Sequence, residues 1–366
     1  MGFADFIGNE PVARRLREAV AANRLPQAMI LAGARGTGKY TLALMFARLV
    51  NCLEPVEADG LPDFCRRCRN CVRIGEAENL DARVSEALEA REDLREVDKR
   101  ETRILVQTHP DVMVIPPDPP QMLIKVGQVR QVIHNAYYRP PSEGRRAVFV
   151  FTSSALMKEA ANSLLKVMEE PPANCTLILL SENPAELLPT IRSRAVLHRL
   201  HAVSTETLER LLAERRPELR GAQRTLVARL AEGAVGRALS LDATAWLGSR
   251  NDALVMLRTA LQQPDDSTLF RMTESYRAGA EGQAKTQAMM RALYGLVEDL
   301  MMLHAGTPEF VRNVDLTAEL QAMASEINID WLERVAEQMH AMESGMRRNL
   351  LRSLSLDAMA VGMARR

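Results

Sequence analysis

A glycine-rich segment that ends in a lysine lies near the start of the chain, and its spacing is typical of phosphate binding. The segment has the pattern G-x-x-x-x-G-K between positions 33 and 39. Glycines let successive backbone N–H groups turn inward around a phosphate, and the lysine reaches the terminal phosphates. The candidate nucleotide-binding residues are Gly33, Gly36, Gly38 and Lys39. This loop could therefore hold ATP or ADP.

The residues that would hold magnesium beside this loop are missing. A hydrolysing site needs Ser or Thr directly after the lysine and an acidic residue at the end of a second strand. The residue after the lysine is Tyr40, whose phenol reaches too far, and Thr41 is turned by about 100° around the expected helix. The candidate second strand, 147–151, is followed by Thr152, and the next acid, Glu159, falls inside the following helix. We therefore expect no magnesium bound in cis and no hydrolysis.

Four cysteines lie within twenty positions and have the spacing of metal ligands. They are Cys52, Cys65, Cys68 and Cys71, in the pattern C-x12-C-x2-C-x2-C. Short gaps let neighbouring thiolates converge on one ion, and four soft ligands in a closed tetrahedron favour a structural zinc. Unpaired core cysteines and an iron–sulfur cluster are the alternatives. The fifth cysteine, Cys175, stands apart, and we expect it to be a small buried side chain.

Alternating strands and helices must position these groups. A short apolar run at 28–32 precedes the glycine loop, and an Ala/Leu-rich stretch at about 39–50 follows it. Later come a strand candidate at 148–151, a helix at 154–170 that two prolines end, and a strand at 176–180. Such alternation predicts a parallel sheet with helices on both faces.

The chain is expected to form three domains, so its fold class is α/β plus all-α. The P-loop domain covers 1–201 and includes the cysteine module at 52–71 and a charged helical insertion at about 76–104. Beyond about position 201 the sequence contains no further strand patterns, which predicts a helical lid at 202–245 and a helical C-terminal domain at 246–366. The insertion gives no signal for chemistry, and a solvated surface helix or hairpin is its simplest interpretation.

Composition limits the partners of the protein. Lys plus Arg and Asp plus Glu both total 47 in 366 residues, so the formal net charge is zero. A protein that held DNA alone through many phosphate contacts would usually be basic, so we expect DNA contact to be local or shared with other subunits. The sequence contains no apolar run of membrane-spanning length and no secretory signal, which predicts a cytoplasmic location without a membrane partner.

Several segments together resemble the AAA+ subunits of the bacterial replicative clamp loader, a part of DNA polymerase III. The resemblance extends along almost the whole chain, and the cysteine insertion directly after the phosphate-loop helix is typical of these subunits. The matching segments are 3–10, 24–28, 109–112, 124–130, 161–172, 188–195 and 236–239. The most specific is 161–172, which is close to "NALLKTLEEPP", whereas Gln27 and Ala195 depart from the family pattern, where His and Cys are usual.

The resemblance implies roles for two arginines. Arg194 corresponds to the family's arginine finger, which reaches ATP on a neighbouring subunit and stabilises charge on the transferring phosphoryl group. Arg237 corresponds to a lid arginine that touches nucleotide in active subunits. For Arg194 the alternative is a surface arginine that caps the strand-to-helix connection. For Arg237 the alternative is an ion pair on a helix surface.

The resemblance also implies an assembly. This chain would be one subunit of a heteropentamer that loads a sliding clamp onto primed DNA, with 347–357 resembling the helix of an oligomeric collar. Because the magnesium ligands are missing and Arg194 is present, we expect a stator-like subunit that acts in trans. A catalytic motor subunit of the same complex is the second hypothesis. A zinc-ribbon DNA-binding or repair factor is the third, and the neutral net charge argues against it.

Overall fold

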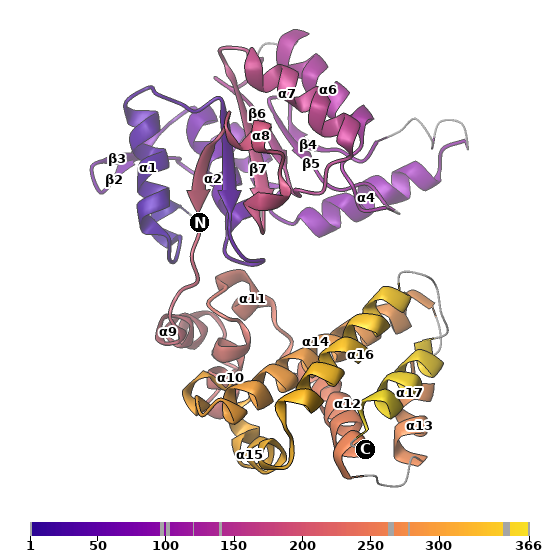
Figure 1. Cartoon of the computed structure of the whole chain (residues 1–366). Coiled ribbons are helices and arrows are strands. Elements are labelled where there is room, and N and C mark those ends of the chain that lie inside the picture. The colour runs from indigo at the N-terminus through magenta and orange to yellow at the C-terminus, as the bar shows by residue number, and fades with distance from the viewer. Residues whose placement is uncertain are drawn as a thin grey trace. The chain divides into compact units, whose positions relative to one another are not determined.

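The computed structural model describes residues 2–95, 99, 103–119, 121–138, 141–262, 267–276, 279–346 and 352–364. These residues form two compact units. The first consists of Met1–Ser204 with Gly233–Arg237, and the second of Thr205–Glu232 with Ala238–Arg366 (Figure 1).

A six-stranded sheet is the centre of the first unit. Its strands lie in the order β4-β5-β6-β7-β1-β8. Only the edge pair β4–β5 is antiparallel, and the other neighbours are parallel. The strands are β1 (Ala28–Ala32), β4 (Val106–His109), β5 (Val112–Ile115), β6 (Ala147–Phe151), β7 (Cys175–Ser181) and β8 (Val196–Arg199). A separate hairpin pairs β2 (Val56–Ala58) with β3 (Leu61–Asp63).

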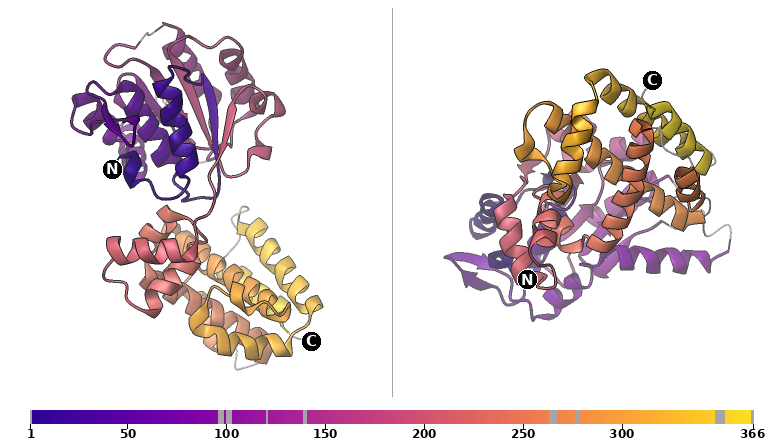
Figure 2. Two further views of the ribbon diagram at one scale, coloured as in Figure 1. Left: turned by 90° about the vertical axis from the view of Figure 1, so that its left-hand side faces the viewer. Right: turned by 90° about the horizontal axis from the view of Figure 1, so that it is seen from below.

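Both faces of the sheet are covered, as the continuous apolar strands predicted. Every residue of β1, β6 and β7 is buried. In β1 the side chains alternate between two cores: Met29 and Leu31 join the core beneath α1 and α2, whereas Ile30 joins the core beneath α6 and α7. Figure 2 shows the N-terminal helices, in indigo, on one side of the strands.

The helices of this unit lie before the first strand and between the later ones in the sequence. They are η1 (Phe3–Asp5), α1 (Glu10–Ala21), α2 (Lys39–Asn51), α3 (Arg69–Gly75), α4 (Leu80–Glu92), α6 (Val126–Tyr138), α7 (Lys158–Glu169), η2 (Pro184–Glu186) and α8 (Pro189–Arg192). Helix α4 lies in the charged insertion, and its apolar residues Leu80 and Val84 pack at the margin of the core beneath α1 and α2.

The second unit is helical throughout its described residues. It contains α9 (Thr205–Arg215), α10 (Ala222–Leu230), α12 (Ala243–Gln262), α13 (Ser267–Glu274), α14 (Gly279–His304), η3 (Pro308–Phe310), η4 (Val314–Leu316), α15 (Thr317–Glu326), α16 (Ile329–Met346) and α17 (Arg352–Met363). Helix α11 (Val235–Ser240) contributes residues to both units. Trp331 and Tyr276 are the largest side chains of the core that α12, α14 and α16 share.

The predicted fold class is confirmed: a P-loop-type parallel sheet is followed by helices. The separate lid predicted at 202–245 stays a prediction, since the second unit groups 205–232 with the C-terminal helices. Of the expected collar segment 347–357, residues 347–351 lie outside the described part of the chain. Leu354 in α17 is 61% exposed, while Leu356 is buried. Among the described helices, none is long and apolar enough to cross a membrane.

Candidate nucleotide cradle and four-cysteine site

The glycines of the phosphate loop adopt the conformations that require glycine. Gly36 and Gly38 have φ angles of 84° and 91°, in the left-handed region that other residues disfavour. Gly38 is also the N-cap of α2, so the loop delivers the chain directly into the helix N-terminus. The structure therefore places Gly33, Gly36 and Gly38 between β1 and α2, and Lys39 is the first residue of α2.

The ammonium group of Lys39 bonds to the loop itself. Its Nζ donates to the carbonyl oxygens of Gly33 at 2.6 Å and Ala34 at 2.8 Å. Burial lowers the pKa of Lys39; the negative charge of Glu182 opposes that shift, and the positive charge of Arg35 adds to it. A bound phosphate would have to replace both carbonyls as the partner of Nζ.

The start of α11 lies against the same loop. The backbone N–H of Gly236 donates to the carbonyl of Gly36 at 2.7 Å. A Cβ on Gly36 would lie only 2.9 Å from the backbone N of Arg237, so a larger residue could not be accommodated without moving Arg237. The structure thus brings Arg237 beside the phosphate loop, and its contact with nucleotide stays a prediction.

Tyr40 turns its hydroxyl away from the loop. Its Oη donates to the carbonyl oxygen of Ala77 at 2.6 Å. Burial raises the pKa of the phenol, and the charges of Glu78 and Asp81 raise it further. The side chain after Lys39 therefore bonds to the chain just after α3 instead of facing a phosphate.

The carboxyl end of β6 carries no acid. Thr152 follows the strand and donates its N–H to Ile115. Glu159 lies in the first turn of α7, where it is exposed. The acid that sequence reasoning missed is Glu182, which follows β7 and influences the pKa of Lys39. Its signal was available, because an acidic residue directly after an apolar strand next to β1 falls at the ligand-binding edge of a parallel sheet.

The four cysteines converge as their spacing predicted. Their Sγ atoms all lie within 4.8 Å of one another. The Sγ atoms of Cys52 and Cys68 are 4.0 Å apart, close to the roughly 3.8 Å that a tetrahedron with Zn–S bonds of about 2.3 Å requires. Backbone N–H groups of Cys65 and Cys68 donate to the sulfurs of Cys52 and Cys65, at 3.3 and 3.2 Å. The site could hold a metal ion.

The protein environment favours the ionisation of the Cys68 thiol and opposes that of Cys52 and Cys71. Burial opposes the ionisation of Cys68, but the backbone N–H groups of Cys71 and Leu53 and the neighbouring thiols outweigh it and lower its pKa to about 6. Burial raises the pKa of Cys52 and of Cys71. Because a metal binds thiolates, an ion here would supply the charge that stabilises the buried sulfurs. Cys175 is buried, as predicted, and burial raises its pKa to about 12.

Two buried asparagines connect the cysteine module to the sheet. Asn51, at the end of α2, accepts from the N–H groups of Arg145 and Arg146 at 2.8 and 2.9 Å. Asn70 of α3 donates to the carbonyls of Asn51 and Glu143 at 3.0 and 2.9 Å. The module therefore shares its hydrogen bonds with the turn that leads into β6.

Arg194 lies at the surface between α8 and β8. Its side chain is 37% exposed, and its guanidinium donates to the Thr190 carbonyl at 3.1 Å and forms an ion pair with Glu169 of α7 at 3.0 Å. The next element, β8, is an edge strand of the sheet, and its residues Val196 and Leu197 are 51% and 39% exposed. An exposed ion pair holds an arginine only weakly, so Arg194 could reach a neighbouring molecule at low energetic cost.

The parallel sheet, the glycine loop after β1 and the helical unit together define a P-loop nucleotide-binding-type protein. The family model described as "DNA polymerase III, delta subunit" matches residues 8–204, more than half of the chain. The protein belongs to this family of DNA polymerase III subunits, which confirms the predicted clamp loader family.

Curated relatives from two branches of this machinery match the chain. The DNA polymerase III subunit tau of Escherichia coli K12 is 26% identical over 314 residues, which cover 80% of this chain and 43% of that protein. The DNA polymerase III subunit delta' of Pseudomonas aeruginosa is 30% identical over 169 residues, or 46% of this chain and 41% of that protein. The chain thus spans less than half the length of these relatives.

A solved structure matches nearly end to end. It is the DNA polymerase III gamma subunit-related protein of Thermotoga maritima, with 16% identity, coverage of 97% of both chains and a TM-score of 0.46.

Proposed function

We propose that the protein is the delta-prime, or stator, subunit of the DNA polymerase III clamp loader. It would support ATP-dependent loading of the sliding clamp onto primed DNA in the cytoplasm, within a heteropentamer that also contains the gamma/tau and delta subunits. The observation that carries this proposal is the residue after Lys39. Tyr40 replaces the small hydroxyl that would bind magnesium, and its own hydroxyl bonds to Ala77.

The remaining features of the loop support the same role. Lys39 is bonded to two loop carbonyls, and Gly236 closes on Gly36, so the cradle's own groups already satisfy one another. Thr152 supplies no carboxylate at the end of β6. Without a hydroxyl after Lys39 or a carboxylate after β6 to hold magnesium, the site would lack the metal ion that neutralises the charge developing on a transferring phosphoryl group.

Arg194 is the group that would act in trans. Its exposed guanidinium lies beside the apolar edge strand β8, whose Val196 and Leu197 would be buried by a neighbouring subunit. In that interface Arg194 would exchange Glu169 for the terminal phosphate of ATP on the next subunit. The four cysteines would bind one structural zinc, because four thiolates leave no open position for a catalytic water.

An ATPase assay on the purified chain tests the proposal. We expect no turnover above background with ATP and magnesium, and no change in Lys39→Ala. Magnesium-dependent hydrolysis that Lys39→Ala abolishes would overturn the stator role.

One observation favours a second candidate, the gamma/tau motor subunit. The tau relative matches 80% of the chain, whereas the delta' relative of Pseudomonas aeruginosa matches 46%. Glu182, whose charge raises the pKa of Lys39, would then be the candidate acid of the cradle. If the chain hydrolyses ATP, Glu182→Gln should abolish that activity under the motor hypothesis.

A further inference from the structure

Segment 2–6, which precedes α1, is bonded directly to the cysteine module. The N–H of Phe3 donates to Oδ2 of Asp63 at 3.1 Å, and the N–H of Phe64 donates to Oδ1 of the same carboxylate at 2.7 Å. Asp63 is buried, and its two oxygens are satisfied by backbone N–H groups, as a buried carboxylate requires. The residues just before Cys65 therefore hold a segment that lies 60 positions earlier in the chain.

An aromatic contact joins the same two segments. The rings of Phe3 and Phe64 meet edge to face, with their centroids 6.0 Å apart. Phe64 is fully buried, and the guanidinium of Arg48 in α2 lies 5.5 Å from its ring centroid. Both rings belong to the core beneath α1 and α2, together with three of the four cysteines. Phe64 thus contacts segment 2–6 and the phosphate-loop helix at the same time.

The hairpin that leads to Cys65 is held from α1. Nε of Arg17 donates to the carbonyl of Pro62 at 3.0 Å, and Nη2 donates to that of Leu61 at 2.9 Å. Figure 1 shows the hairpin β2–β3 beside this helix. A two-stranded hairpin with three residues in each strand is not stable alone, so its position depends on Arg17 and on the cysteine that follows it.

Segment 2–6 also lies against the phosphate loop. A Cβ on Gly38 would lie 3.0 Å from Cε2 and 3.1 Å from Cζ of Phe6, so the Phe6 ring packs directly on the loop backbone. Gly38 is the N-cap of α2, and Phe6 is buried in the same core as Phe64. The backbone at Gly38 therefore cannot move in this direction unless the ring of Phe6 moves first.

Cys65 connects these contacts to the candidate metal site. Asp63 and Phe64 directly precede it in the sequence. Arg66 directly follows it and forms an ion pair with Asp5 at 3.5 Å. A metal ion bound by the thiolate of Cys65 would tie these residues to the other three cysteines, whereas without the ion a short hairpin would have to hold them.

We infer that the cysteine module positions the phosphate loop. With a metal bound, Asp63 and Phe64 hold segment 2–6 in place, and Phe6 of that segment supports the loop at Gly38. Loss of the metal therefore loosens the phosphate loop, although the loop carries no metal ligand. The inference rests on the metal site proposed above, and it holds whether the chain is the stator or the motor subunit.

Hydrogen exchange of the full chain, measured by mass spectrometry before and after treatment with a chelator, tests the inference. Elemental analysis gives the metal content of each sample. We expect metal removal to raise exchange at 52–71, 2–6 and 33–38 and to leave β6 and β7 unchanged, because local contacts protect only the segments they hold. A rise confined to 52–71 would overturn the inference alone, whereas native protein without metal would also refute the metal site.

Two variants that keep all four cysteines separate the two contacts. Asp63→Ala leaves the N–H of Phe3 without its acceptor, so exchange at 2–6 and 33–38 should rise about tenfold or more, as expected for the loss of a hydrogen bond to a charged group. Phe6→Ala should raise exchange at 33–38 while 52–71 stays protected and the metal stays bound. Phe6→Leu keeps much of the volume against Gly38 and should restore the protection of the loop.

The matched control is Arg67→Ala, which removes an exposed ion pair with Glu54 within the cysteine module. This variant should keep both the metal and the exchange of the parent protein, and equal loosening of the loop by Arg67→Ala would overturn the inference. Parent-like exchange at 33–38 in Asp63→Ala and Phe6→Ala would also overturn it, even if chelation loosens the whole chain. If Asp63→Ala loses its metal, Phe3→Ala replaces it, because it removes the ring that contacts Phe64 from segment 2–6.

Discussion

The hydroxyl of Tyr40 donates a hydrogen bond of 2.6 Å to the carbonyl oxygen of Ala77. Tyr40 is the second residue of α2, and Ala77 lies just after α3, the helix that carries Cys71. The position where an active P-loop protein binds magnesium is therefore used here to attach the phosphate-loop helix to the segment that follows the cysteine module. The side chain at this position therefore has a structural role.

The first prediction concerns this bond. Tyr40→Phe keeps the ring but leaves the buried Ala77 carbonyl without this donor, so the free energy of unfolding should fall by about 1 kcal/mol. Tyr40→Ser should destabilise the protein more, because it also removes the partly buried ring, and it should not create ATPase activity while Thr152 remains. Urea denaturation measures the first two effects. Tyr138→Phe, at a 75% exposed position, is the control that should change nothing.

The second prediction is metal content. Elemental analysis of the native protein should find about one zinc per chain, and removal of zinc with a chelator should lower the melting temperature. Cys71→Ser should abolish stoichiometric zinc, because its sulfur is buried within 4.8 Å of the other three. Cys175→Ser is the matched control and should keep the metal. Native protein that is folded and free of zinc would refute the zinc site.

Local pattern and spacing predicted much of the site. The β1–loop–α2 unit, β6, α7 and β7 were predicted from apolar runs and their breakers, since both signals are local. The convergence of the cysteines was predictable because two of the gaps are only two residues long. The particular strand order, and β4 as an antiparallel edge strand, were not, because strand order depends on tertiary packing.

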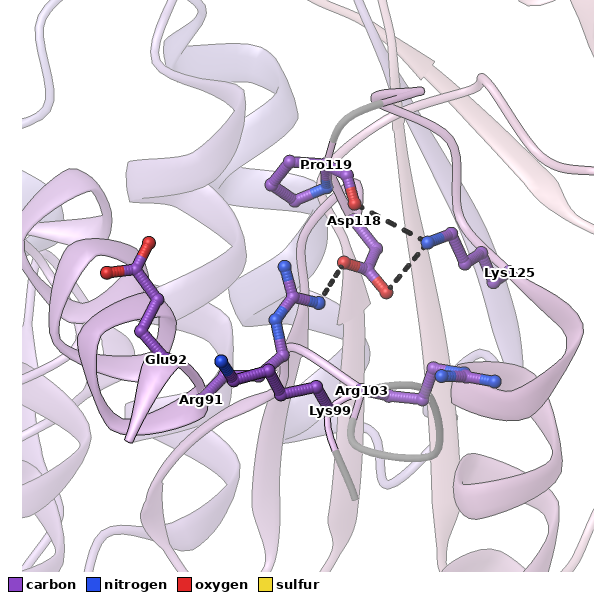
Figure 3. A pocket seen from close by; sticks show the side chains of 7 residues that line it. All are labelled: Arg91, Glu92, Lys99, Arg103, Asp118, Pro119 and Lys125. Carbon is purple, nitrogen blue, oxygen red and sulfur yellow. Dashed lines mark hydrogen bonds and ion pairs between the residues drawn. The ribbon is translucent and has the colours of Figure 1, made fainter. Parts of the chain in front are cut away.

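Long-range contacts account for other features that could not be predicted from the sequence. Tyr40 and Ala77 are 37 residues apart, and nothing in either local pattern marks them as partners. Asp118 reads as a loop residue in a proline-rich segment, yet it is fully buried because Arg91 and Lys125 neutralise it from two other segments (Figure 3).

The third prediction concerns Arg194. In the reconstituted clamp loader, Arg194→Ala should leave assembly intact and slow DNA-stimulated ATP hydrolysis by up to about 10³-fold, the magnitude of a trans arginine finger. Glu169→Gln is the matched control: it removes the ion-pair partner of Arg194 and should leave the rate unchanged or higher. Normal hydrolysis with Arg194→Ala would remove the finger role and leave only the surface ion pair.

The fourth prediction is a pH dependence that arises at His109. The buried Nδ1 of His109 accepts a hydrogen bond from the N–H of Asp111 at 3.1 Å, so the ring is held neutral. Burial lowers its pKa; the charges of Asp111 and Glu143 oppose that shift, and those of Arg73 and Arg69 add to it. The unfolded chain therefore binds a proton at this histidine more readily than the folded one. Its contribution to stability is present above the unfolded pKa of about 6.5 and is lost as pH falls below that value.

His109→Asn isolates this contribution, because the amide oxygen of Asn can accept the same N–H but does not titrate. We expect the free energy of unfolding of the parent protein to fall more steeply between pH 7.5 and 5.5 than that of His109→Asn, by at most about 1.4 kcal/mol per pH unit. Titrating groups that do not contact His109 are common to both proteins, so their contributions cancel in the difference. His304→Asn, at an exposed position, should keep the parent slope. If the parent and His109→Asn have equal slopes, the ring does not resist protonation in the folded state, and the hydrogen bond from Asp111 cannot be what holds it neutral.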